Sequence, residues 1–411
     1  MQKNLHLQNN PVKSPSHPQK SLITFCANLP FRILQLSGFF PTSIKSSSNS
    51  ISPLPTPFYL SLPAIWLITL ICITLFPLFL VSLTYTQERD EIPEFVMQGR
   101  NTFLMINVFY GVASIFCPIL SRLILFLSRK KFATFWQSFC LLVEKFQTDN
   151  FDRSIQIKWS RNCWTKFVLH GTLHWINSIL QSILYMKQGV LSKFDDGDIL
   201  KFWNVWIFSL NSVLSCFALH GLIYFVASYE LIVTLLLQSL SNLRNDKALR
   251  VQELVEVYIA LDRNVTEFLD LFAKYLNINI MYLFIYLLYV AYSSYSLIRI
   301  KEYVLFGLSV TQMVIGVASL YWLTSCASGV ERGSRQFCKR VKFESFEISK
   351  KSRAVGGAGL VMENVERLPA LDPIKLDNTL LTLDLRLLIS ILAAIATYMV
   401  VIVQFQAMDS S

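Results

Sequence analysis

The sequence predicts an all-α, polytopic membrane protein with seven transmembrane helices. Hydrophobic residues make up 53% of the 411 residues and charged residues only 16%, whereas soluble proteins carry about 25% charged residues. The apolar residues are gathered into long runs instead of being spread evenly. Each of seven such runs is close to the ~20 residues that a helix needs to cross a bilayer.

The N-terminal segment, residues 1–57, precedes the first of these runs. It contains no Asp or Glu and is rich in Ser, Asn and Pro, a composition typical of flexible segments. We expect it to be cytosolic, with the apolar stretch Leu22–Phe40 lying at the membrane surface. An organellar transit peptide is the alternative explanation of this Ser-rich, acid-free start.

The predicted spans fall within residues 58–327 and 387–408. Hydrophobic run lengths place them at Leu62–Tyr85, Thr102–Leu127, Trp164–Met186, Phe202–Ser228, Leu276–Ile298, Glu302–Cys326 and Leu387–Met408. The third is the most polar, and the fourth runs on without a break signal through Leu231–Leu240.

The connections between spans predict the orientation. Of the 37 lysines and arginines, 27 lie in the N-terminal segment and the three long connections, and seven lie in the short ones. Basic residues concentrate on the cytosolic side of membrane proteins. We therefore expect a cytosolic N-terminus and an extracellular C-terminus, the reverse of a G-protein-coupled receptor. The net charge of +10 follows from this distribution and does not indicate nucleic-acid binding.

The second long connection, about 229–274, has the pattern of a helix. Apolar residues recur there at alternating steps of four and three: Leu254, Tyr258, Leu261, Val265, Phe268 and Phe272. This spacing forms one continuous helical face. We expect the fourth and fifth helices to extend beyond the membrane and pack together in the cytosol. The seam could close within one subunit or between subunits.

The last span carries the most informative pattern. It has no charge between Leu387 and Met408, and a single helical face collects Ala394, Thr397, Val401, Gln404 and Met408. Polar groups exposed to lipid are costly, so this face is expected to turn toward protein or water.

Four residues of the same span resemble a family signature. Thr397-Tyr398 is followed by five apolar residues and then Gln404-Phe405, and a short segment Gly38–Pro41 precedes the first span. Both features are similar to insect gustatory receptors. The resemblance implies a ligand-gated, poorly selective cation channel, in which four subunits surround a pore lined by the last span of each. Gln404 and Phe405 would then form the gate near its outer end.

The resemblance also implies a cytosolic anchor domain, built from the extensions around 229–274 and an anchor loop at 328–386. Residues 353–372 depart from the family pattern, so subunit contacts there are not implied. Partner subunits of the same family, identical or different, are expected, and so is the plasma membrane of chemosensory dendrites.

A pocket for a small-molecule tastant would need aromatic walls with few polar groups. The outer halves of the spans supply Tyr110, Trp175, Gln181, Trp206, Asn211 and Gln312, together with Asn177, Trp203, Tyr289 and Tyr292. The sugar-receptor branch typically has Glu after Thr-Tyr, where this chain has Met399. The resemblance therefore favours bitter or other non-sugar compounds.

Two other functions stay open. The chain could be a seven-span receptor that signals through a cytosolic partner and conducts nothing. A transporter has less support, because no intramembrane acid and base pairs suggest proton coupling.

No motif predicts an enzyme, a cofactor or a metal site. His170 and His174 share a helix face, but no nearby carboxylate completes a zinc site. The single glycosylation sequon, Asn264-Val265-Thr266, falls in a predicted cytosolic connection and is expected to stay unmodified.

Overall fold

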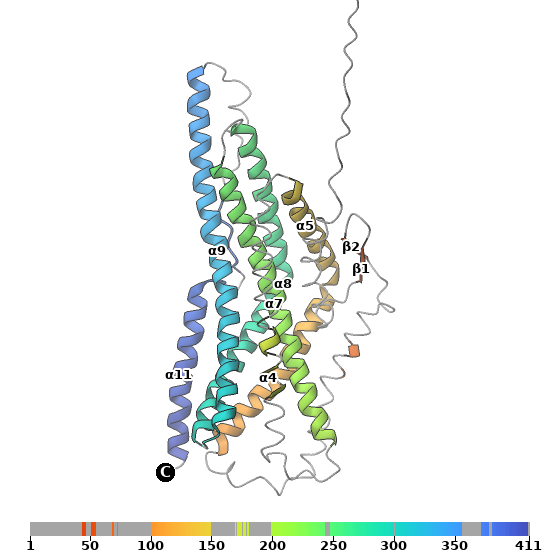
Figure 1. The fold of residues 1–411 in the computed structure, drawn as a ribbon, viewed down its shortest axis with the longest axis vertical. Coiled ribbons are helices and arrows are strands. Elements are labelled where there is room, and N and C mark those ends of the chain that lie inside the picture. The colour runs from red at the N-terminus through yellow and green to blue at the C-terminus, as the bar shows by residue number, and fades with distance from the viewer. Residues whose placement is uncertain are drawn as a thin grey trace, which may run out of the picture.

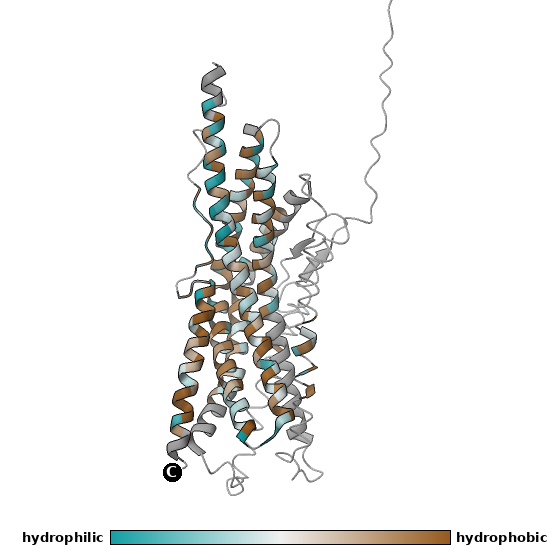
Figure 2. Ribbon diagram, turned by 60° about the vertical axis from the view of Figure 1, so that its left-hand side comes forward, coloured by the Kyte–Doolittle hydropathy of each residue, from teal (hydrophilic) through white to brown (hydrophobic). Residues whose placement is uncertain are grey.

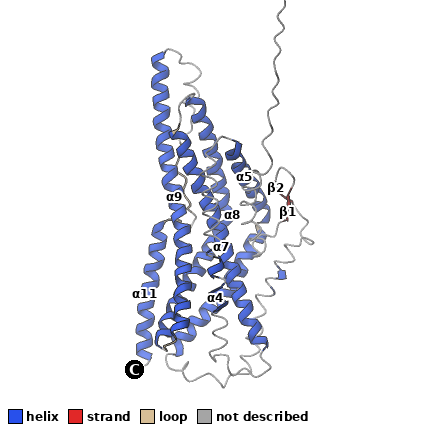
Figure 3. Ribbon diagram, in the orientation of Figure 1, coloured by secondary structure: helices blue, strands red, loops and turns tan. Residues whose placement is uncertain are grey.

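The structure, a computed structural model, describes a part of the chain that is almost entirely helical (Figure 3). The described residues are 43–46, 51–54, 68–69, 72, 100–148, 169, 171–174, 176–177, 179–180, 199–242, 247–299, 301–355, 371–377 and 380–409. The helices are α4 (Arg100–Leu127), α5 (Arg129–Thr148), α7 (Ile199–Ser241), α8 (Lys247–Arg299), α9 (Tyr303–Val355) and α11 (Leu385–Asp409). A short antiparallel pair, β1 (Ser43–Ser46) and β2 (Ile51–Leu54), is the one sheet of the described part, with Ser43 opposite Leu54.

Three long helices form the body of the molecule (Figure 1). α9 packs along both α7 and α8, while α4 packs mainly on α8 and α5 continues beyond α4. α11 lies at the edge of the bundle, beside the first half of α9, and contacts α4, α8 and α9. Among the described helices, α11 thus lies at the edge of the bundle.

Four single helices of the described part are long and apolar enough to cross a membrane. They cover Leu219–Ser241, Leu249–Arg299, Tyr303–Ile348 and Leu385–Phe405, and the bent pair Val112–Leu127 and Lys130–Phe139 could supply a fifth crossing. The helices α4, α7, α8, α9 and α11 overlap the predicted second, fourth, fifth, sixth and seventh spans, respectively. The predicted first and third spans, Leu62–Tyr85 and Trp164–Met186, lie mostly outside the described residues.

The helices are much longer than a bilayer requires. α7 has 43 residues, and α8 and α9 have 53 each, against ~20 for one crossing. Figure 2 shows the half of α9 beside α11 as mostly hydrophobic and its far half as hydrophilic. The predicted extension of the fourth and fifth helices beyond the apolar part is thus present, and the sixth helix has one as well.

The extension of α9 corrects one expectation. The segment from residue 328 was expected to be a loop, but α9 continues through it to Val355. The basic stretch Arg335–Lys351 contains no Gly or Pro, so nothing in it stops a helix. Glu331 and Arg335, one turn apart, form an ion pair at 2.6 Å. The helix ends just before Gly356-Gly357, a common stop signal.

The six seam residues of α8 are all buried, between 0% and 7% exposed. Most of the charged residues interspersed with them, such as Glu253 and Arg263, are exposed. The seam therefore packs inside its own subunit. Of the two alternatives, closure within one subunit or between subunits, the first holds for these residues.

An aromatic cluster fills the junction of α5, α7 and α8. Its centre is Phe225 of α7, whose ring centroid lies between 5.2 and 6.1 Å from those of five neighbours. The neighbours are Phe135, Trp136, Phe139, Phe268 and Phe272. Large aromatic side chains contribute most to the stability of a core, so this cluster joins three helices where they leave the apolar part.

A buried hydrogen-bond chain lies beside this cluster. The Tyr229 hydroxyl donates to Asn264 Oδ1 at 2.8 Å, and Asn264 Nδ2 donates to Ser138 Oγ at 3.0 Å. Asn264 is 0% exposed. Both ends of its amide are used, and no enzyme can reach it in the folded chain.

We therefore expect no glycan at Asn264 on the mature protein. Treatment with an endoglycosidase should leave the electrophoretic mobility of the protein unchanged, as it should for Asn264→Gln. A mobility shift in the wild type alone would contradict both the burial and the predicted cytosolic location of this segment.

Two glycines let α7 and α9 approach closely. A Cβ on Gly329 would collide with the carboxylate of Glu230, and a Cβ on Gly333 would lie 2.6 Å from Cγ1 of Val233. Gly329 and Gly333 are four residues apart, the small-xxx-small spacing that brings helices together in membranes. The closest contact between α7 and α9 thus depends on these two missing side chains.

Candidate functional site

The N-terminal end of α11 is firmly held. Asp384 caps the helix, because its Oδ1 accepts from the Leu387 N–H at 3.0 Å. The Leu385 N–H donates to Ser328 Oγ of α9 at 3.2 Å. Leu388 and Ile391 are buried against the bundle. The first two turns of α11 are therefore tied to the rest of the subunit.

The rest of α11 is exposed. Only 17% of its apolar span is buried, against 78% for the span of α7. Of the predicted stripe, Thr397, Val401 and Gln404 are exposed and Ala394 is half-buried. At 3.6 residues per turn, this stripe lies roughly opposite the buried residues Leu388 and Ile391. It faces away from its own subunit. The side chain of Met408 lies outside the described residues.

The other motif residues have different surroundings. Tyr398 is half exposed, but its ring lies 6.1 Å from that of Phe284 on α8. Thr397 donates to the carbonyl oxygen of Ala393 in its own helix at 3.0 Å. Phe405 is 56% exposed. Tyr398 thus links α11 to the bundle, while Gln404 and Phe405 are presented outward.

Several predicted pocket residues lie together. Tyr110 of α4 stacks on Tyr289 of α8 with ring centroids 4.0 Å apart. Gln312 of α9 is buried, and its Oε1 accepts from the Tyr286 hydroxyl at 2.9 Å. Tyr286 also lies 6.1 Å from Tyr110. This aromatic cluster connects α4, α8 and α9 in the apolar part of the bundle.

Sequence reasoning missed two members of this cluster. Tyr286 bonds to Gln312, and Tyr282 lies 6.4 Å from Tyr286. Together with Tyr289 they are spaced by four and three residues, which places them on one helical face. That spacing was visible in the sequence. Because the rings contact one another, a ligand entering here would have to separate them.

Other predicted pocket residues have different positions. Asn177 is buried and donates to the carbonyl oxygen of Leu308 at 3.0 Å. Tyr292 is buried on α8. Trp203, Trp206 and Asn211 lie on α7, but their side chains are outside the described part, and so are Trp175 and Gln181 altogether. The pocket prediction for these last five residues stays untested.

A cavity of about 330 Å³ lies elsewhere, at the junction of α4 and α5, lined by Leu127, Ser128, Lys130 and Lys131. Its lining residues are not part of the cluster of Tyr110, Tyr286, Tyr289 and Gln312. His174 is buried, while His170 lies outside the described residues. Within the described residues no group of three or more His, Cys, Asp or Glu side chains could hold a metal ion.

The fold and the long apolar helices define a class of protein: a polytopic helical membrane protein. Residues 28–353 match the family described as 7tm chemosensory receptors. The match covers most of the chain, which therefore belongs to this family. Members of the family are receptors and not enzymes. Comparison with curated proteins gave no match.

Solved structures agree with this assignment of the fold. The chain is similar to the insect olfactory receptor OR5 from Machilis hrabei, with a TM-score of 0.58 at 11% identity, covering 94% of this chain and 98% of that one. It is also similar to the same receptor in complex with eugenol, with a TM-score of 0.60 at 13% identity, covering 94% and 99%. The seven-span fold predicted from the sequence is thereby confirmed.

Proposed function

We propose that this chain is a gustatory receptor: a subunit of a ligand-gated, poorly selective cation channel, most simply a tetramer, in the plasma membrane of chemosensory neurons. Its N-terminus is cytosolic, its C-terminus is extracellular, and the extensions of α7, α8 and α9 form a cytosolic anchor. The observation that carries the proposal is the exposed face of α11, described above.

An apolar helix with a polar stripe is poorly suited to lipid. The Thr397 hydroxyl is bound within its own helix, but the Gln404 amide on that face would be costly in hydrocarbon unless it met water or another subunit. One helix cannot enclose a pore, but several copies around a symmetry axis can, each presenting the same stripe. Val401 and Phe405 would narrow the path, and the Gln404 amides would contact ions when it opens.

The ligand class rests on two features. The aromatic cluster around Tyr110, Tyr286 and Gln312 offers large ring faces together with uncharged hydroxyl and amide groups, which suits a small aromatic compound. Met399 stands where the sugar-receptor branch typically has Glu. Both features favour a bitter or other non-sugar compound. The solved OR5 receptor in complex with eugenol binds a compound of this kind, which supports the proposal by analogy of fold.

The Gln404→Glu substitution tests the pore. A ring of carboxylates would attract cations, so we expect a ligand-evoked current with a larger divalent permeability and a shifted reversal potential. The measurement is whole-cell recording in cells that express the chain, during a panel of bitter compounds and sugars.

Ser390→Glu is the control for position along the pore, because Ser390 is exposed on the same helical face as Gln404 but lies near the N-terminal end of α11, away from the proposed gate. We expect a smaller change in reversal potential there. A ligand-evoked current with identical permeability in Gln404→Glu would remove Gln404 from the pore. A ligand response without any current would favour the receptor that signals through a cytosolic partner.

A further inference from the structure

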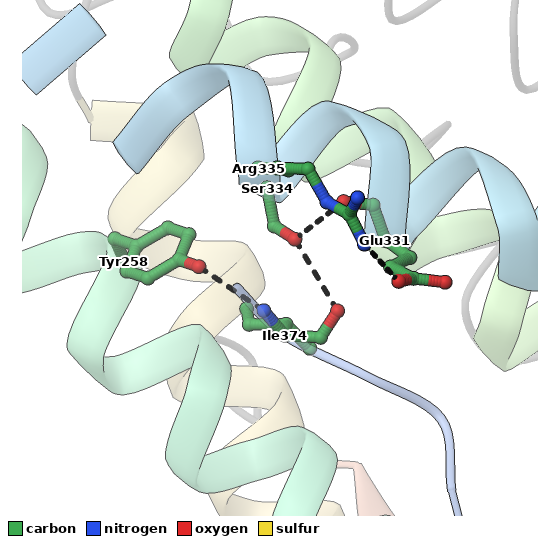
Figure 4. Close-up of polar contacts among 5 residues, drawn as sticks. All are labelled: Tyr258, Glu331, Ser334, Arg335 and Ile374. Carbon is green, nitrogen blue, oxygen red and sulfur yellow. Dashed lines mark hydrogen bonds and ion pairs between the residues drawn. The ribbon is translucent and has the colours of Figure 1, made fainter. Parts of the chain in front are cut away.

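The residues that lead into α11 are held between the extensions of α8 and α9. Residues 371–377, here called the linker, have no helix or extended sheet. Nevertheless Leu371, Ile374 and Leu376 are all buried. Figure 4 shows the linker passing between Tyr258 of α8 and Ser334 of α9.

Tyr258 holds the linker from the α8 side. Its hydroxyl donates to the carbonyl oxygen of Asp372 at 2.8 Å and accepts from the Ile374 N–H at 3.3 Å. The Cys338 thiol donates to the hydroxyl oxygen of Tyr258 at 3.3 Å. The ring stacks on Phe337 of α9 with centroids 4.8 Å apart. Burial raises the pKa of the Tyr258 phenol above its ordinary value, so it stays protonated and able to donate.

Ser334 holds the same residue from the α9 side. Its hydroxyl points to the carbonyl oxygen of Ile374 at 3.2 Å and to that of Glu331 at 2.9 Å. The N–H of Ile374 is thus bound to α8 and its carbonyl to α9. A buried residue whose N–H and C=O are bound by side chains of two different helices is fixed in position. We call this pair of contacts the Tyr258–Ser334 clamp.

The clamp is continuous with the start of α11. The Leu383 N–H donates to the carbonyl oxygen of Leu376 at 3.1 Å, and Asp377 pairs with Thr382 in an isolated antiparallel bridge. Asp384 follows as the helix cap. A chain of hydrogen bonds therefore runs from Tyr258 to the first turn of α11. The opposite half of α11, with Val400, Gln404 and Phe405, is exposed.

A helix tied at one end and free at the other moves at its free end. We propose that Tyr258 and Ser334 are positioning residues for gating: the clamp fixes the N-terminal end of α11 as a pivot, so that ligand binding displaces its C-terminal half. The inference rests on the proposed channel function. Loosening the pivot would allow the whole helix to shift and would weaken the coupling between ligand and gate.

Tyr258→Phe is the test, since it keeps the ring and its stacking but removes the hydroxyl. Hydrogen exchange is measured on the full chain in lipid nanodiscs, and ligand-evoked current is measured in cells. We expect the amide of Ile374 to exchange about three- to tenfold faster, with faster exchange also at Leu385 and Leu387. The ligand concentration for half-maximal current should rise about two- to tenfold. Ser334→Ala should do the same from the other helix.

Tyr303→Phe, at an exposed tyrosine of α9, is the control and should change neither measurement. Exchange could rise in the linker alone, while exchange in the first turn of α11 and the current response stay as in the wild type. The clamp would then be only local packing, and the inference would be wrong. If the wild-type chain responds to no ligand with a current, the channel proposal fails. Exchange in the first turn of α11 then decides only whether the clamp positions that turn, and the role of the clamp in gating falls with the channel proposal.

Discussion

Phe225→Ala should prevent the chain from reaching the cell surface in normal amounts. Phe225 of α7 is 1% exposed and its ring packs near five aromatic rings from α5 and α8. Truncating such a residue removes apolar contacts and leaves a cavity, at a cost of about 3–5 kcal/mol. That is a large fraction of the stability of a typical domain. The measurements are surface labelling and the temperature at which the solubilised protein aggregates.

Phe343→Ala is the matched control, because this phenylalanine of α9 is 61% exposed. It should leave both measurements near their wild-type values. Phe225→Leu should fall between the two, since it keeps part of the volume. A wild-type aggregation temperature in Phe225→Ala would show that the aromatic cluster around Phe225 contributes little to stability. Other contacts would then hold α5, α7 and α8 together.

Gly333→Ala should destabilise the chain, whereas Gly307→Ala on the same helix should not. The added Cβ at Gly333 would lie 2.6 Å from Cγ1 of Val233, but at Gly307 no atom lies within 4 Å. Overpacking costs about 1–3 kcal/mol. At Gly307 no such clash arises, and the higher helix propensity of alanine should stabilise the helix by up to about 1 kcal/mol. The two substitutions should therefore shift the aggregation temperature in opposite directions.

The collision partner provides a rescue experiment. Val233→Ala removes the Cγ1 atom that a Cβ at Gly333 would meet, so the double variant should recover part of the loss caused by Gly333→Ala. Non-additivity of this kind is expected only for residues in contact. Equal aggregation temperatures for Gly333→Ala and Gly307→Ala would mean that α7 and α9 can separate at little cost.

Periodic patterns were read correctly from the sequence because they follow from local geometry. The seam from Leu254 to Phe272 is buried as its spacing requires, and the outward stripe of Thr397, Val401 and Gln404 follows from 3.6 residues per turn. The membrane class followed from composition and from run lengths. These features depend on residues within a few turns of each other, so no knowledge of the fold was needed.

Features that depend on partners far apart in the chain were not predictable. Nothing near Tyr258 in the sequence indicates that its hydroxyl binds the backbone of Asp372, 114 residues later. The stacking of Tyr110 on Tyr289 likewise depends on how α4 crosses α8. The helical course of α9 to Val355 was missed because a basic, apolar-poor stretch resembles a loop in composition, although charged residues are good helix formers.

The uninterrupted course of α7, α8 and α9 restricts how the length of this chain can change. Inserting one residue in the middle of a helix rotates everything beyond it by about 100° and moves it by about 1.5 Å. In α8 such an insertion between Tyr258 and Tyr286 would turn one of them away from its partners, and in α9 one between Gln312 and Ser334 would do the same. Substitutions change these helices one contact at a time, whereas insertions and deletions change every contact beyond them. Insertions and deletions should therefore be tolerated between the helices and rejected within them.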